Sequence, residues 1–104
     1  MLGRHRKKLS LVAVILVLVA LLAAPAMAAS EQGSRSCPTS WSVGVASETT
    51  GLTTHYAPIG SVIGVYNNGI VLQMRYSLSG LQSTSWKAST NGYMNYYLTY
   101  AYCY

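Results

Sequence analysis

Few side chains of residues 29–104 could carry out acid–base or nucleophilic chemistry. They are one histidine, His55, the glutamates Glu31 and Glu48, and many serines, with no aspartate. General acid–base catalysis needs paired titratable groups, and a nucleophilic triad needs a base that an acid orients. His55, Glu48 and a serine could form such a set on paper, but a single histidine at a strand end is more often a surface or capping residue. The sequence therefore predicts that this protein is not an enzyme.

Ligands for metals and phosphates are scarce as well. A metal site needs three or four ligands of the His, Cys, Asp and Glu types, and the two cysteines are far apart rather than in a CxxC pair. No glycine-rich loop leads from a strand into a helix, as nucleotide binding requires. We expect no metal and no cofactor.

Tyrosine is the unusual component of the composition. The chain has nine tyrosines and two tryptophans, and no phenylalanine. Tyrosine has a flat apolar face and a hydrogen-bonding tip, which suits sugar stacking and protein interfaces. It also fits strands well and can serve as half-buried cover. The composition is compatible with both interpretations.

The two Asn-Gly dipeptides are the clearest local signals, because both residues tolerate the positive φ of a type I′ hairpin turn. Asn68-Gly69 predicts a hairpin of residues 61–79, and Asn91-Gly92 predicts a hairpin of residues 84–104. Alternation along the second strand of the first hairpin predicts a buried face. Its residues are Ile70, Leu72, Met74, Tyr76 and Leu78.

The second hairpin predicts a candidate binding site. A two-residue turn would place Lys87 opposite Tyr96, while Trp86 and Cys103 would share the inner face. Alternate residues of the returning strand would then point into solvent. An aromatic row with one cation suits sugar rings that carry an anionic group. The predicted ligand-binding residues are Lys87, Tyr96, Tyr100 and Tyr102.

Short alternating segments cut by Gly, Asn and Pro predict an all-β chain. Trp41–Val45 and Leu52–Tyr56 add two strands before the hairpins, which gives about six short strands. We expect one domain over residues 37–104, a small antiparallel β-sandwich or open barrel. The polar residues 29–36 are expected to form a mobile tail.

The first residues have the order of a secretory signal peptide. A basic opening is followed by apolar residues from Leu11 to Ala24, then Pro25 and the small-residue triplet Ala26-Met27-Ala28. This order predicts cleavage after Ala28 and a secreted, extracellular protein that keeps no membrane span. A retained anchor is the alternative, but the apolar tract is shorter than the roughly 18 residues that a spanning helix needs.

Removal of residues 1–28 changes the charge of the protein but keeps both of its cysteines. The formal charge of +5 becomes +1, because three cationic residues, Arg35, Arg75 and Lys87, remain with two glutamates. No cluster of basic residues is left that could bind nucleic acid. Cys37 and Cys103 both stay, near the two ends of the domain. A pair of cysteines in a small exported domain predicts a disulfide, here closing a loop of about 66 residues. A metal or redox pair is the alternative.

Short patches spread along the chain resemble a known family. They are Trp41-x-x-Gly44-Val45, Val65-Tyr66-Asn67-Asn68-Gly69, Ser85-Trp86-Lys87-Ala88-Ser89-Thr90 and Tyr96-Tyr97. In this order they resemble the lactococcin 972-like bacteriocins, small exported β-sandwich proteins whose founding type binds the lipid-linked cell-wall precursor. The resemblance implies action on the bacterial cell envelope, with a cell-wall precursor or envelope glycan as partner. The chain departs from the family by its cysteine pair, its one histidine after residue 28 and its few charges.

Three functions are compatible with these observations. A bacteriocin-like protein would inhibit the growth of related bacteria. A non-toxic carbohydrate- or cell-wall-binding module would bind isolated wall without affecting growth. A secreted inhibitor or interaction protein would present a loop, such as Thr49–Pro58, to a protein partner and bind it stoichiometrically.

Overall fold

The computed structural model describes residues 29–104, which form seven β-strands and no helix. The strands are β1 (Ala29–Ser36), β2 (Val43–Thr49), β3 (Leu52–Tyr56), β4 (Val62–Asn67), β5 (Gln73–Leu78), β6 (Ser83–Thr90) and β7 (Met94–Cys103). The predicted signal peptide, residues 1–28, lies outside the described residues.

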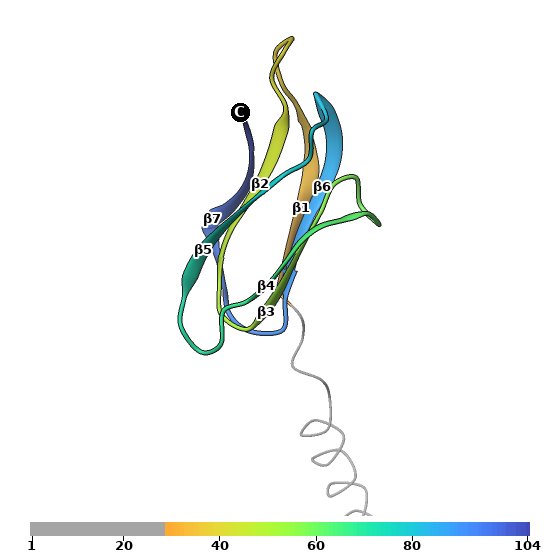
Figure 1. The fold of residues 1–104 in the computed structure, drawn as a ribbon. Coiled ribbons are helices and arrows are strands. Elements are labelled where there is room, and N and C mark those ends of the chain that lie inside the picture. Colours follow the sequence, from red (N-terminus) through yellow and green to blue (C-terminus); the bar gives the residue numbers. More distant parts are fainter. Residues whose placement is uncertain (1–28) are drawn as a thin grey trace, which may run out of the picture.

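The strands form two antiparallel sheets that pack as a sandwich (Figure 1). One sheet has the order β1-β6-β3-β4, and the other has the order β5-β2-β7. Ladder partners are antiparallel throughout. The predicted all-β fold is therefore confirmed, as a sandwich of seven strands.

The space between the sheets holds a small apolar core beside a polar region. The apolar cluster is Val45, Ala57, Trp86, Ala88 and Met94. The buried polar residues include Ser47, Thr49, Thr53, His55, Ser77, Thr90 and Thr99. Each buried polar side-chain atom in residues 29–104 has a hydrogen-bond partner, which removes most of the cost of burying it.

The prediction that residues 29–36 form a mobile tail is wrong, because they form the edge strand β1. They pair with β6 along their whole length, from Ala29 opposite Thr90 to Ser36 opposite Ser83. The last pair also joins its two hydroxyl groups at 2.8 Å. A polar sequence can form such a strand because the ladder uses backbone groups, and polar side chains suit a solvent-exposed edge.

Neither predicted hairpin forms. β4 lies in the four-stranded sheet and β5 in the three-stranded one, and β6 and β7 are divided in the same way. Both Asn-Gly connections therefore cross from one sheet to the other. In the described part of the chain, only β3 and β4 are consecutive strands that pair with each other.

The two Asn-Gly dipeptides instead hold the short connection between β2 and β3. The Asn68 amide donates to the carbonyl of Thr49 at 3.1 Å. From the other side, the Asn91 side chain accepts a hydrogen bond from the backbone N–H of Leu52 at 2.8 Å. The β2–β3, β4–β5 and β6–β7 connections thus lie together at the lower end of the sandwich in Figure 1. Because Asn and Gly serve any tight connection, their presence could not by itself distinguish a hairpin from a crossing.

The predicted faces of β5 are also reversed. Ser77 is buried between the sheets, whereas Tyr76 and Leu78 lie on the outer face and are more than half exposed. Leu72, predicted to be buried, precedes the strand and is 42% exposed. The side chains of β5 alternate as predicted, but Tyr76 and Leu78 point outward because the inward position of Ser77 belongs to the polar region.

This arrangement predicts opposite effects for two aspartate substitutions. Leu72→Asp should change the free energy of unfolding by less than about 0.5 kcal/mol, since the carboxylate meets water. Ser77→Asp should cost several kcal/mol, since it places a charge between the sheets. Urea denaturation of both variants measures the difference, and similar midpoints would contradict this assignment of faces.

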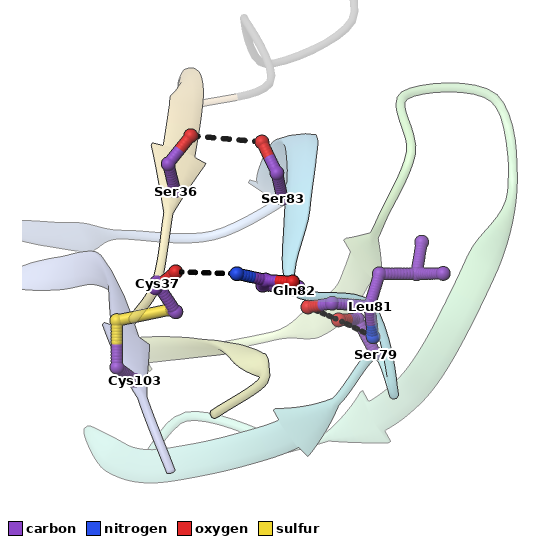
Figure 2. The surroundings of a disulfide bond; sticks show 7 residues. All are labelled: Ser36, Cys37, Ser79, Leu81, Gln82, Ser83 and Cys103. Atoms are coloured by element: carbon purple, nitrogen blue, oxygen red, sulfur yellow. Dashed lines mark hydrogen bonds between the residues drawn. A yellow bond between two sulfur atoms is a disulfide. The ribbon is translucent and has the colours of Figure 1, made fainter. Parts of the chain in front are cut away.

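The predicted disulfide between Cys37 and Cys103 is present, with the two Cα atoms 5.7 Å apart. Figure 2 shows that it joins the end of β1 to the end of β7, which lie in different sheets. Gln82 fixes the position of Cys37, because its side-chain amide donates to the Cys37 carbonyl at 3.2 Å and its own carbonyl accepts from the Cys37 N–H at 2.9 Å. The bond is thus a covalent link between the two sheets.

Candidate functional site

The outer face of the three-stranded sheet carries a group of tyrosines. Ser77 on β5 is buried, and Ala101 on β7 packs against the apolar core. Their neighbours along each strand therefore point outward. These neighbours are Tyr76, Leu78, Tyr100 and Tyr102. Together with Tyr104, which follows β7, the tyrosines among them form what we call the tyrosine face: Tyr76, Tyr100, Tyr102 and Tyr104.

Tyr102 is the centre of the tyrosine face. Its ring centroid lies 5.9 Å from that of Tyr76 and 6.3 Å from that of Tyr100, both edge to face. The Tyr104 ring is tilted by 50° at 6.1 Å. Because the rings meet at angles, they do not form one flat platform. Tyr76, 56% exposed, and Tyr100, 38% exposed, each offer a ring surface of their own to a ligand.

The central ring also covers the sheet. Tyr102 pairs across the ladder with Gly44, and a Cβ atom at that position would overlap the tyrosine ring. Burial raises the pKa of the Tyr102 hydroxyl, and the neighbouring tyrosine hydroxyls raise it further. The hydroxyl therefore stays protonated at neutral pH and can donate a hydrogen bond.

Lys87, a predicted ligand-binding residue, lies on the other sheet. It belongs to β6, where it pairs with Gln32 of β1 and Tyr56 of β3. Its neighbours Trp86 and Ala88 are buried between the sheets, so Lys87 points out from the opposite side of the sandwich. The predicted pairing of Lys87 with Tyr96 is therefore wrong.

Tyr96, the other predicted residue outside the tyrosine face, lies in a bulge of β7. The ladder between β2 and β7 pairs Ala46 with Tyr100 and resumes with Glu48 opposite Asn95. Residues 96–99 therefore form a long β-bulge opposite a single residue of β2. The sequence of β7 alternates without interruption across this bulge, so alternation could not predict where the bulge lies.

Asn95 holds the bulge in place. Its side-chain oxygen accepts from the backbone N–H of Tyr97 at 3.1 Å, and its carbonyl accepts from the Thr99 hydroxyl at 2.9 Å. As a result Tyr96 and Tyr97 both project into solvent, with Tyr97 95% exposed. Tyr97 therefore does not share the inner face with Thr99, which is buried.

A second cluster, which the sequence did not predict, lies between the sheets around His55. The ring Nε2 lies 2.6 Å from the Ser47 hydroxyl on β2, and Nδ1 lies 2.7 Å from the Ser77 hydroxyl on β5. The Tyr66 hydroxyl meets the Ser77 hydroxyl at 2.7 Å and donates to the carbonyl of Tyr76 at 2.7 Å. These hydrogen bonds join side chains of β3 and β4 to Ser47 and Ser77 of the facing sheet.

The direction of these bonds fixes the tautomer of His55. The Tyr66 proton goes to the carbonyl of Tyr76, so the Tyr66 oxygen must accept the proton of Ser77. The Ser77 oxygen then accepts from Nδ1–H of His55. Burial lowers the pKa of His55 from 6.5 to about 4, so the ring is neutral at pH 7 and its Nε2 accepts from Ser47.

His55 is fully buried, so the expectation of a surface or capping residue is wrong. The space for its partners depends on Gly64 of β4, where a Cβ atom would overlap the Ser77 and Tyr66 hydroxyl groups. The residues of this cluster come from the inward positions of four strands, β2 to β5, so only a correct assignment of the strand faces could have predicted it.

The catalytic combination considered from the sequence does not assemble. Glu48 accepts a hydrogen bond from the Asn95 amide at 3.1 Å, while His55 bonds to two serines. Residues 29–104 contain no group of three His, Cys, Asp or Glu side chains that could hold a metal ion. The described residues also contain no helix that is long and apolar enough to cross a membrane.

Segment Thr49–Pro58 is not the free loop that an inhibitor would present. Its central part is β3, which pairs with β6 on one side and β4 on the other. A strand in the interior of a sheet has no free backbone edge with which to bind a partner.

Comparisons with known proteins return no relative. No protein-family model, no curated protein and no solved structure matches this chain. Inference about function therefore rests on the residues and their geometry.

Proposed function

We propose that this protein is a secreted, bacteriocin-like protein that binds a glycan of the bacterial cell envelope through the tyrosine face. The observation that carries the proposal is the gathering of four tyrosines on one outer sheet face, with Tyr76 and Tyr100 exposed around Tyr102. Aromatic faces pack on the apolar faces of sugar rings, and tyrosine hydroxyls hydrogen bond to sugar hydroxyls.

Two further observations support the envelope as the place of action. The resemblance to the lactococcin 972-like bacteriocins implies it, and the disulfide suits an oxidising compartment outside the cytoplasm. The ligand is expected to be held mainly by uncharged contacts, since the four tyrosines carry no charge and Glu48, which points out from the same sheet, accepts a hydrogen bond from Asn95.

The test is the double variant Tyr76→Ser/Tyr100→Ser. Because both rings are exposed, the thermal transition should move little, while binding to isolated peptidoglycan should fall roughly tenfold or more. Sedimentation of residues 29–104 with the insoluble glycan measures this. Tyr102 is left in place because it covers Gly44.

Lys87→Ala is the matched control, since Lys87 lies on the opposite side of the sandwich and should not affect binding. Equal binding by the double tyrosine variant and the native protein would refute this function for the tyrosine face. A non-toxic wall-binding module would use the same rings, and growth of Gram-positive test strains with added native protein separates it from a bacteriocin.

A further inference from the structure

Glu48 is the accessible side chain on β2, the central strand of the three-stranded sheet. The six other residues of this strand are buried. Its neighbour Ser47 points between the sheets to His55, so Glu48 points out on the side of the tyrosine face. The outward positions of β5 and β7 carry no charge. Glu48 is therefore the one charged group that the three strands present on this face.

The register of the sheet places Glu48 next to the two exposed rings of the tyrosine face. Ala46 lies between Tyr76 on β5 and Tyr100 on β7, and Glu48 follows two residues later on the same face. Two residues of an extended strand span about 7 Å. Ala46 is fully buried although it points outward, so neighbouring side chains cover it. One short oligosaccharide lying along this face can thus touch an exposed ring and the carboxylate together.

One oxygen of the Glu48 carboxylate is bonded, and the other is open to a ligand. The Asn95 amide donates to Oε1 at 3.1 Å, and it is the hydrogen-bond partner of this carboxylate among the described residues. Because no buried side-chain oxygen of residues 29–104 lacks a partner, Oε2 faces solvent. Asn95 is itself fixed, since its side-chain oxygen accepts from the N–H of Tyr97 at 3.1 Å. The carboxylate is thus oriented before a ligand arrives, which lowers the entropy cost of binding.

The cation of the same sheet points away from Glu48. Arg75 is the only cationic residue of β2, β5 and β7, and its Nε donates to the side chain of Asn68, which follows β4, at 2.8 Å. Its guanidinium carbon lies 5.4 Å from the centre of the Tyr66 ring on β4. The tyrosine face therefore has a negative charge at one end, in place of the positive charge that Lys87 was predicted to supply.

We propose that Glu48 is a specificity-determining residue of the tyrosine face, which accepts hydrogen bonds from the hydroxyl groups of an uncharged glycan and repels anionic wall polymers such as teichoic acid. This inference rests on the proposed function and names the class of glycan. A carboxylate only accepts hydrogen bonds, and sugar hydroxyls donate to it in charge-assisted bonds. A phosphate beside Glu48 would meet a like charge with no cation to offset it, which disfavours such a ligand.

The test compares residues 29–104 of the native protein and of Glu48→Gln by sedimentation with peptidoglycan from which teichoic acid has been removed. Glutamine keeps the size of the side chain and an oxygen for the Asn95 amide, so the thermal transition should stay unchanged. It cannot form charge-assisted bonds, so binding should fall roughly tenfold. Binding of the native protein should persist at high salt, because its partner is uncharged.

Glu31→Gln is the matched control. It removes the same charge from β1, in the other sheet, and should bind peptidoglycan as the native protein does. A reversal of charge tests the repulsion directly. Soluble teichoic acid in excess should not displace the native protein from peptidoglycan, whereas Glu48→Lys should gain binding to walls that retain teichoic acid, and salt should suppress that gain.

Equal binding by Glu48→Gln and the native protein would overturn the proposal and leave Glu48 as a support for Asn95 alone. Displacement of the native protein by teichoic acid, or loss of its binding at high salt, would overturn it as well. Failure of the proposed function gives a different result. If Tyr76→Ser/Tyr100→Ser binds as the native protein does while Glu48→Gln does not, the tyrosine face is refuted and the role of Glu48 stands. Absence of binding by the native protein would refute both.

Discussion

Reduction of the Cys37–Cys103 disulfide is expected to lower the free energy of unfolding by about 4 kcal/mol. The bond joins residues separated by 66 positions, and release of so long a loop gives the unfolded chain a large gain in entropy. The loss is comparable with the total stability of a small domain. The thermal midpoint should therefore fall by at least ~15 °C, which differential scanning calorimetry with and without reductant measures.

The position of the disulfide means that few other contacts between the sheets could replace it. Cys37 follows β1 and Cys103 ends β7, so the disulfide ties together two sheets that otherwise share a small apolar cluster around Trp86 and the hydrogen bonds of His55. The double variant Cys37→Ala/Cys103→Ala should reproduce the loss without reductant, and reductant should have no effect on it. A transition that is unchanged in either experiment would refute this role.

The sequence was a good guide to strands and a poor guide to their partners. Period-two alternation placed segments such as Leu52–Tyr56 correctly, because alternation reflects the backbone of one strand alone. Which strand pairs with which depends on contacts between distant segments. The Asn-Gly dipeptides at positions 68–69 and 91–92 satisfied the requirements of a hairpin, yet their side chains bind the β2–β3 connection instead.

The candidate site shows the same limit. Tyr100 and Tyr102 were placed outward correctly, because the inward positions of Thr99 and Cys103 follow from alternation within β7. Lys87 was misplaced because its position relied on the hairpin, which does not exist. On β5 the rule that apolar side chains point inward chose the wrong face, since Ser77 is the inward residue that meets His55.

Acid is expected to destabilise the domain through His55. The folded pKa of about 4 lies below the value of 6.5 for the unfolded chain, because burial disfavours the charged ring. Between these values the unfolded state binds the proton more readily than the folded state does. The stabilising difference is therefore complete above pH 6.5, and it is lost as the pH falls toward 4, with a total change of about 3 kcal/mol.

The structure explains why the folded state resists protonation. A charged ring would have to donate from Nε2 as well, and the proton of Ser47, which now bonds to that nitrogen, would lose its acceptor. A proton there would disturb a chain of bonds that runs through Ser77 to Tyr66 and joins the two sheets. Protonation of His55 would therefore weaken the packing of β5 and β2 against β3 and β4.

Urea denaturation of residues 29–104 between pH 7.5 and 4 measures the effect, and His55→Gln is the variant that isolates it. The variant should be less stable than the native protein at pH 7, because glutamine cannot reproduce both hydrogen bonds, but its stability should change little between pH 6.5 and 4. The same comparison is made in a Glu31→Gln/Glu48→Gln background, which removes the two carboxylate side chains of residues 29–104. If His55→Gln keeps the full acid dependence in that background, the buried histidine is not its source. Imidazole nitrogen chemical shifts at pH 7 provide a separate check, since the hydrogen bonds put the proton on Nδ1 and the lowered pKa leaves Nε2 unprotonated.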